Sequence, residues 1–91
     1  MIKSCQVQIK NRLGLHTRPA TSIVKLLQNF KSDVHFIHKE ERANAKSILS
    51  LLMLAARRDT DITVEIDEDE SENAEYIMEK IIELFDNKFG E

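Results

Sequence analysis

The sequence predicts an α+β fold in which a small sheet is covered on one face by helices, and three observations predict it. Segments in which apolar and polar residues alternate are typical of strands with one buried face. Between them lie segments whose apolar residues recur at helical spacing. No repeat or linker interrupts the 91 residues, of which 42% are hydrophobic and 32% charged. We therefore expect one domain over residues 1–91, ordered strand, helix, strand, short strand, short helix, strand, helix.

The chain begins with a strand pattern and continues with a helical one. Cys5, Val7 and Ile9 alternate with polar residues, which predicts a strand with one buried face. After a break at residues 11–14, helical spacing predicts a helix over residues 17–29. The apolar positions of this helix are Ala20, Ile23, Val24, Leu27 and Phe30.

The middle of the chain predicts a hairpin and a short helix. Residues 33–38 alternate with Val34 and Phe36 on one face, and a turn at residues 39–41 leads to a short strand through Ala43. Residues 46–56 are almost all apolar and rich in leucine and alanine, which favours a short helix. This run is too short to cross a bilayer, which needs about 20 residues.

The last third predicts a strand and a final helix. Ile62, Val64 and Ile66 alternate with polar residues, and an acidic stretch follows at residues 67–72. Asp69 or Ser71 can cap the helix, and acidic residues suit its positive end. The inner face of this helix is formed by Ala74, Ile77, Met78, Ile81 and Phe85.

The stretch GLHTRP, residues 14–19, places a histidine among rare residues, because the chain has only two glycines and one proline. Pro19 suits a first helical turn, where its missing N–H would have no partner, and Gly14 lets the loop turn sharply. His16 is then expected at or just before the helix N-terminus, where free N–H groups and the helix dipole favour a phosphate. The same positive end disfavours imidazolium, so we expect a neutral, nucleophilic His16 with Arg18 as a forked donor beside it. The alternative is that His16 only caps the helix and Arg18 is a solvated charge.

Charge and composition argue against several kinds of function. The net charge is −3 and no basic stretch could follow a phosphate backbone, so we expect no nucleic-acid partner. A single cysteine, Cys5, excludes an internal disulfide, and the polar start is unlike a signal peptide, so the cytoplasm is the simplest location. His35 and His38 would face opposite sides of a strand, so we expect no metal site there.

Two motifs resemble a known family. NRLGLHTRPA, residues 11–20, resembles the active-site signature of HPr, the histidine-containing phosphocarriers of the bacterial phosphotransferase system. NAKSILSLLMLAA, residues 44–56, is similar to the family's second signature, around a regulatory serine. The resemblance covers essentially the whole chain, and it implies an open-faced sandwich. In that fold a four-stranded antiparallel sheet is covered on one face by three helices, in the order βαββαβα.

The resemblance also implies a chemistry. His16 matches the histidine that is phosphorylated through Nδ1, Arg18 matches the arginine that attends the phosphoryl group, and Thr17 would help to bind it. Phosphoenolpyruvate is the original donor, Enzyme I passes the group to the carrier, and an IIA protein or domain that usually serves sugar uptake receives it. No cofactor resides on the carrier, and the partner enzymes supply most of the catalysis, so "carrier" describes it better than "enzyme". We expect a monomer that does not insert into membranes.

Ser47 matches the family's regulatory serine, which a dedicated kinase phosphorylates in some bacteria. A phosphate there would add about −1.5 to −2 charges and would hinder an acidic partner. The alternative is that Ser47 is simply a helix cap, a position that serine favours.

An apolar docking patch is expected beside Ser47. Ile48, Leu49 and Leu52 fall at helical spacing and would be exposed, with Ile48 and Leu52 favoured as contacts; the alternative is that they belong to the core. Thr17, Thr21 and Lys25 would border this patch.

The chain departs from the family where glycines are usual, because only Gly14 and Gly90 are present. Asp59 or Asn44 could take a left-handed turn at modest cost. Arg57 and Arg58 are unusual and could adjust the choice of partner.

Three alternative functions stay open. The carrier could serve a regulatory, nitrogen-related branch of the phosphotransferase system instead of sugar uptake. A small α+β binding module without covalent chemistry is a second alternative. A histidine phosphatase is a third, although no second histidine or arginine motif supports it.

Overall fold

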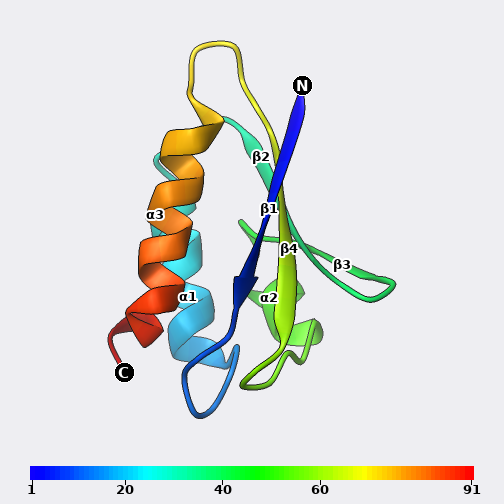
Figure 1. Cartoon of the computed structure of the whole chain (residues 1–91), viewed down its shortest axis with the longest axis vertical. Helices are drawn as coiled ribbons and strands as arrows, with labels where there is room; N and C mark the ends of the chain where they lie inside the picture. The colour runs from blue at the N-terminus through cyan, green and yellow to red at the C-terminus, as the bar shows by residue number, and fades with distance from the viewer.

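The structure is a computed structural model that describes residues 1–91. Its elements follow the predicted order βαββαβα, with one further turn of helix at the end (Figure 1). They are β1 (Ile2–Gln8), α1 (Thr17–Leu27), β2 (Asp33–His38), β3 (Glu41–Asn44), α2 (Ile48–Met53), β4 (Asp61–Asp67), α3 (Ala74–Asp86) and the 3-10 helix η1 (Lys88–Gly90).

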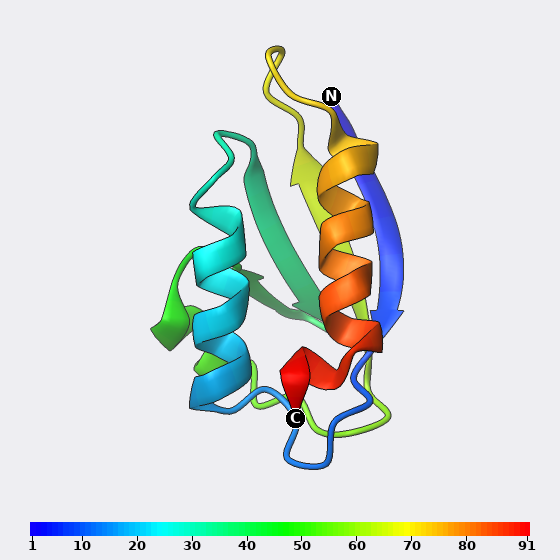
Figure 2. The same cartoon turned by 90° about the vertical axis from the view of Figure 1, so that its left-hand side faces the viewer.

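The four strands form one antiparallel sheet in the order β1-β4-β2-β3. Val64 of β4 lies opposite Cys5 of β1 on one side and opposite Phe36 of β2 on the other. This register places the apolar residues of the three strands on the same face, because side chains alternate along each strand. Figure 2 shows α1 and α3 side by side over this face, while the other face of the sheet is left open. The arrangement confirms the open-faced sandwich.

The core lies between the sheet and the inner faces of α1 and α3. Phe36 is fully buried and packs edge-to-face on Phe85, with ring centroids 5.7 Å apart. The apolar residues predicted for the inner faces of the first and last helices are buried, with two exceptions. Phe30 and Met78 are only partly buried against the core. None of the helices combines the length and the apolar composition that crossing a bilayer requires.

The second helix is shorter than predicted. The apolar run of residues 46–56 predicted a helix along its whole length, but α2 extends only over Ile48–Met53. Ala55 has a left-handed backbone (φ 50°), and its N–H donates to the carbonyl of Leu52 at 3.1 Å, which ends the helix. Leu54 within that turn and Ala56 after it are buried, so part of the apolar run lies in a packed loop.

The predicted caps of the last helix are wrong. Asn73 is the N-cap of α3, and its side chain accepts from the N–H of Tyr76 at 3.1 Å. Asp69 instead accepts from the N–H and the hydroxyl of Ser71, which closes a turn inside the loop. Because an N-cap must directly precede the first helical residue, a helix that starts at Ala74 cannot use either of them.

At one end of the molecule, the carboxylate of Glu72 links residues 31–32 to the loop before α3. Glu72 accepts from the N–H of Lys31 at 2.8 Å and from the N–H and hydroxyl of Ser32 at 2.8 and 2.7 Å. The hydrogen bonds from Ser32 and Lys31 hold the pKa of Glu72 below its ordinary value. Ser32 is buried and in turn accepts from the N–H of Asp69 at 2.9 Å. This network joins the start of β2 to the loop before α3.

Candidate functional site

His16 lies where the sequence predicts it, as the N-cap of α1. Its backbone is extended (φ −96°, ψ −170°), and the helix begins at the next residue. Pro19 occupies the third helical position and is buried, so its missing N–H leaves no gap in the helix. The first intrahelical hydrogen bond runs from the N–H of Ala20 to the carbonyl of His16, at 3.0 Å.

Gly14 brings the loop before α1 against the chain that follows α2. Its φ of +70° lies in the left-handed region, and a Cβ at this position would approach the carbonyl oxygen of Ala56 to 2.3 Å. Leu15 is buried and donates its N–H to that same carbonyl at 3.0 Å. Glycine is therefore required at position 14 both for the backbone shape and for the close approach that positions His16.

The N-terminus of α1 is open to an anion. The side chain of His16 makes no capping hydrogen bond, and the first turn holds no acidic residue. The N–H groups of Thr17 and Arg18 have no carbonyl partner within the helix, because the first turn of any α-helix lacks them. These two donors and the helix dipole together favour a negatively charged group at this point.

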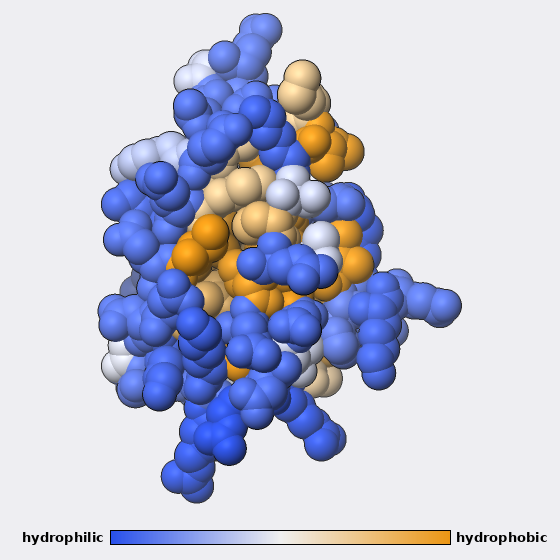
Figure 3. Space-filling model, in the orientation of Figure 1, coloured by the Kyte–Doolittle hydropathy of each residue, from blue (hydrophilic) through white to orange (hydrophobic).

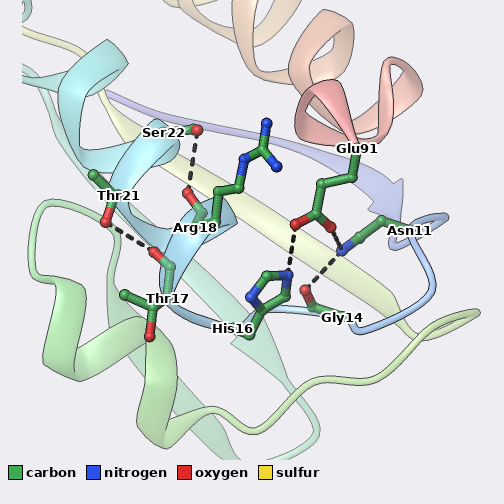
Figure 4. Close-up of polar contacts among 8 residues, drawn as sticks. All are labelled: Asn11, Gly14, His16, Thr17, Arg18, Thr21, Ser22 and Glu91. Atoms are coloured by element: carbon green, nitrogen blue, oxygen red, sulfur yellow. Dashed lines mark hydrogen bonds and ion pairs between the residues drawn. The ribbon is translucent and has the colours of Figure 1, made fainter.

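Glu91 touches the histidine ring, a contact that the sequence analysis missed. Its Oε2 lies 2.7 Å from Nε2 of His16, and its Oε1 accepts from Nδ2 of Asn11 at 2.9 Å (Figure 4). The buried Nε2 has no well-aligned hydrogen bond, so the contact with Glu91 is mainly electrostatic. A carboxylate oxygen this close repels a lone pair, so it favours the neutral tautomer that has its proton on Nε2. Nδ1 then keeps its lone pair, on the side of the ring turned away from Glu91.

A tight turn after α3 carries Glu91 to this position. Lys88, Phe89 and Gly90 all have left-handed backbones, with φ of 52°, 56° and 78°. Phe89 is buried and packs edge-to-face against Phe85, with ring centroids 4.8 Å apart. The buried phenyl ring offsets the strain of two non-glycine residues in that conformation. An apolar residue followed by glycine after a helix could have signalled a tethered turn, but not its contact with His16.

Asn11 supports the same arrangement from the other side of the loop. The residue is 1% exposed, and its Nδ2 also donates to the carbonyl of Gly14 at 2.8 Å. One amide group thus fixes both the loop that precedes His16 and the carboxylate of Glu91. No sequence pattern identified this role, because asparagine at a strand end is common in ordinary turns.

Arg18 is exposed and forms no ion pair or side-chain hydrogen bond within the chain. It lines the same surface hollow as Glu91, and Figure 4 shows its guanidinium on the side of α1 that faces Glu91. Its five N–H donors are therefore free for a ligand beside His16. Thr17 is also exposed, while the hydroxyl of Thr21 donates to the carbonyl of Thr17 at 2.8 Å.

The predicted docking residues lie on two neighbouring helices, α1 and α2. Lys25 is exposed and Thr21 is half-buried on α1, while α2 exposes 37% of Ile48 and 68% of Leu49. Leu52 is partly buried against the core, so it offers less surface than expected. Met53, at the end of α2, is 73% exposed and extends the apolar surface.

Ser47 is the N-cap of α2 in the structure. Its hydroxyl oxygen accepts from the N–H of Ser50 at 3.2 Å, and the side chain of Ser50 accepts from the N–H of Asn44 at 2.8 Å. Both serine side chains thus accept hydrogen bonds from the backbone and stabilise the start of α2. The capping role considered in the sequence analysis is present, and Ser47 is half-buried.

Comparisons with known proteins cover almost the whole chain. A family model described as "PTS HPr component phosphorylation site" matches residues 3–87. Phosphocarrier protein HPr of Chlamydia pneumoniae is 43% identical over 83 residues, which is 91% of this chain and 74% of that protein.

Solved structures are similar over the same range. A crystal structure of HPr-C-His from Thermoanaerobacter tengcongensis has a TM-score of 0.87 and 30% identity, covering 98% of this chain and 97% of that one. A second structure from that organism, described as an HPr dimer, has a TM-score of 0.73 and 30% identity. The similarity covers 93% of this chain and 94% of that one. The expected monomer therefore stays a prediction.

Proposed function

The chain belongs to the HPr family of phosphocarrier proteins, and from that premise we propose that His16 is the residue that accepts and passes on the phosphoryl group. The observation that carries this proposal is the open N-terminus of α1 with a histidine as its N-cap. The nucleophile and the donors that would receive the phosphoryl oxygens lie within one helical turn.

The transfer step follows from the geometry. Nδ1 of His16 donates its lone pair to phosphorus while the bond from phosphorus to the donor group breaks, and the donor keeps that electron pair. The N–H groups of Thr17 and Arg18 and the guanidinium of Arg18 bind the phosphoryl oxygens. Positive charge develops on the ring, and the carboxylate of Glu91, whose Oε2 lies 2.7 Å from Nε2, stabilises that charge. The reverse sequence gives the group to an acceptor, because a protonated imidazole leaves readily.

We place the protein between Enzyme I, which carries the phosphoryl group of phosphoenolpyruvate, and an IIA protein or domain for sugar uptake in the cytoplasm. The docking face would consist of the first turns of α1 and the exposed side of α2. A partner that covers the exposed Leu49 and Met53 would bury apolar surface next to the phosphoryl site. Lys25 would pair with acidic groups at its border.

The decisive experiment is phosphorylation by phosphoenolpyruvate and Enzyme I. We expect the wild-type protein to gain one acid-labile phosphoryl group, and His16→Ala to gain none. His35→Ala is the matched control, because His35 lies on β2 and on the open face of the sheet. If the wild-type protein takes up nothing from a competent Enzyme I, the proposal is wrong.

Arg18→Ala tests the guanidinium. We expect about tenfold slower transfer, since a charge-assisted hydrogen bond to the phosphoryl group is lost, with an unchanged fold. Rapid-quench kinetics and circular dichroism measure the two quantities. Lys25→Ala, which removes a charge farther along α1, should have a smaller effect. Wild-type kinetics in Arg18→Ala would refute the role of this residue.

Glu91 is proposed as a positioning residue that holds the Nε2 proton. Glu91→Ala should leave the neutral ring as a mixture of its two tautomers and slow transfer by about threefold to tenfold. Glu91→Gln keeps an acceptor oxygen and should retain most of the preference for the tautomer with the proton on Nε2. The nitrogen-15 shifts of the ring separate this role from a merely structural one. If Glu91→Ala leaves these shifts unchanged, Glu91 does not select the tautomer.

Ser47 is proposed as a regulatory site that acts through charge. A phosphate oxygen at this position can still cap α2, so the helix should persist while negative charge faces an acidic partner. Ser47→Asp should slow phosphorylation by Enzyme I. Ser4→Asp is the control, because Ser4 is an exposed residue of β1. Equal rates for wild type and Ser47→Asp would remove this switch.

A further inference from the structure

A surface hollow of about 440 Å³ lies beside the phosphoryl site and is strongly basic. Its lining brings together four segments that are distant in sequence: the loop before α1, the first turn of α1, the loop before β4 and the turn after α3. Five of the thirteen basic residues of a chain with net charge −3 surround it. They are Lys10, Arg12, Arg18, Arg58 and Lys88.

Most of these cations have no partner within the protein. Lys10 pairs with Asp86 at 2.7 Å, but the other four form no ion pair and donate no side-chain hydrogen bond. Glu91 is the one carboxylate of the lining, and Asn11 and His16 already occupy its two oxygens. The fold therefore gathers more positive than negative charge around this hollow, and the like charges repel one another.

The lining also defines the chemistry of a ligand. Leu13 is the one hydrophobic residue of the hollow, so an apolar molecule would gain little there. Figure 3 shows the corresponding lower end of the molecule covered almost entirely by hydrophilic side chains. A guanidinium binds a phosphate with two parallel hydrogen bonds. Three guanidiniums and one ammonium therefore offer more hydrogen-bond donors than a single phosphate can accept. The volume falls within the range of small-molecule sites, about 300–1,000 Å³.

We propose that this hollow, the basic pocket, binds a small metabolite that carries two or more phosphoryl groups. Arg12, Arg58 and Lys88 hold the ligand on the side away from the helix N-terminus, and Arg18 reaches it from α1. The assignment gives a role to Arg58, which the family resemblance marked as unusual and the phosphotransfer step does not use.

Arg18 links the basic pocket to His16. A polyphosphate that engages Arg18 draws it away from a phosphoryl group on His16, and the two anions repel each other. The ligand should therefore shift the phosphotransfer equilibrium away from phosphorylated His16, and phosphorylation should weaken ligand binding by the same factor. This coupling, unlike the binding itself, rests on the proposed function of His16.

Binding is tested by titrating the full chain with inorganic pyrophosphate and with ATP at fixed ionic strength, followed by amide NMR and calorimetry. We expect saturable binding with shifts centred on Arg12, Arg58 and Lys88, and weaker binding of orthophosphate. Arg58→Gln should weaken pyrophosphate binding about tenfold, as expected for one lost charge-assisted contact. Lys39→Gln makes the same charge change in the turn between β2 and β3, and should alter binding less than about twofold.

Two results would overturn the proposal at this stage. One is the absence of saturation, and the other is an equal loss in Arg58→Gln and Lys39→Gln, which would show only that any lost positive charge weakens binding, wherever it lies on the surface.

A transfer assay without pyrophosphate separates this proposal from the preceding one. Arg58→Gln should accept the phosphoryl group from Enzyme I at the wild-type rate, and pyrophosphate should slow the wild-type protein more than the variant. Slow transfer by Arg58→Gln without ligand would make the basic pocket a contact for the donor protein and overturn the small-molecule assignment. A wild-type protein that binds pyrophosphate but is never phosphorylated would refute the function of His16 and leave the ligand site standing.

Discussion

The starts of α1 and α3 are built in opposite ways. At α3, Asn73 caps the N–H of Tyr76, and Glu68 accepts from the N–H of Ala74 at 2.7 Å. At α1, the N-cap is His16, which caps nothing, and no acidic residue lies in the first turn. The helix that only supports the sheet satisfies its own N–H groups, while the helix beside the histidine leaves them for a ligand.

The remaining helix agrees with this contrast. Ser47 caps α2 through the N–H of Ser50, as an ordinary helix start would be capped. An uncapped N-terminus sacrifices stability, since a good N-cap contributes about 1 kcal/mol. The open end of α1 therefore marks the place where the fold gives up stability for binding. Four substitutions can break or sharpen this comparison.

Gly14→Ala should have the largest effect, because it disturbs the loop that places His16. The left-handed backbone and the approach of the new Cβ to Ala56 should together cost about 3 kcal/mol of unfolding free energy, measured with urea. Gly90→Ala is the matched control. Gly90 also has a positive φ, but its Cβ would meet nothing within 4 Å, so we expect a loss of about 1 kcal/mol. Equal losses would show that the contact with Ala56 is unimportant.

Asn73→Ala should have the next largest effect, because it opens the capped end of α3. We expect a loss of about 1 kcal/mol in unfolding free energy with no change in transfer rate. Asn73→Asp retains an acceptor oxygen and should keep most of the stability. A slower transfer by Asn73→Ala would show that the two helix ends are coupled.

His16→Asn should convert the open end of α1 into a capped one. Asparagine is a strong N-cap residue, so the variant should gain about 0.5 kcal/mol of stability while losing all transfer. His16→Ala should lose transfer without that gain. If His16→Asn is no more stable than His16→Ala, the histidine does not occupy a position that can be capped.

Acid should weaken the network around Glu72, with the smallest effect because solvent screens this exposed end. The hydrogen bonds lower the pKa of Glu72 from its ordinary 4.5, so its contribution is present above that pH and is lost as the pH falls through the lowered pKa. The urea midpoint of Glu72→Gln should therefore fall less between pH 5 and pH 3, roughly the range of carboxyl titration. Glu79→Gln, an exposed residue of α3, is the control. If the urea midpoints of Glu72→Gln and wild type fall in parallel with pH, the lowered pKa of Glu72 does not contribute to stability.

The strands and the histidine loop could be predicted because local patterns determine them. The alternation at residues 33–38 matches β2, and Gly14 and Pro19 locate the start of α1. Asp59 takes the left-handed conformation expected of it (φ 70°), whereas Asn44, the alternative, continues β3. These features depend on neighbours along the chain.

Features that depend on distant contacts could not be predicted. The end of α2 depends on Ala55 and on the burial of Leu54 and Ala56, which composition does not distinguish from a longer helix. The contact between Glu91 and His16 requires a turn that the burial of Phe89 stabilises. The basic pocket likewise collects residues from four segments, none of which is strongly basic alone.

The acidic stretch before α3 and the basic pocket lie at opposite ends of the molecule, as Figure 2 shows for the two loops that carry them. The protein is therefore an electric dipole as well as a weak anion. An acidic surface that approaches it would rotate it so that His16 leads, even before the two surfaces touch. Productive encounters should become rarer as ionic strength rises, while the lifetime of a formed complex changes little.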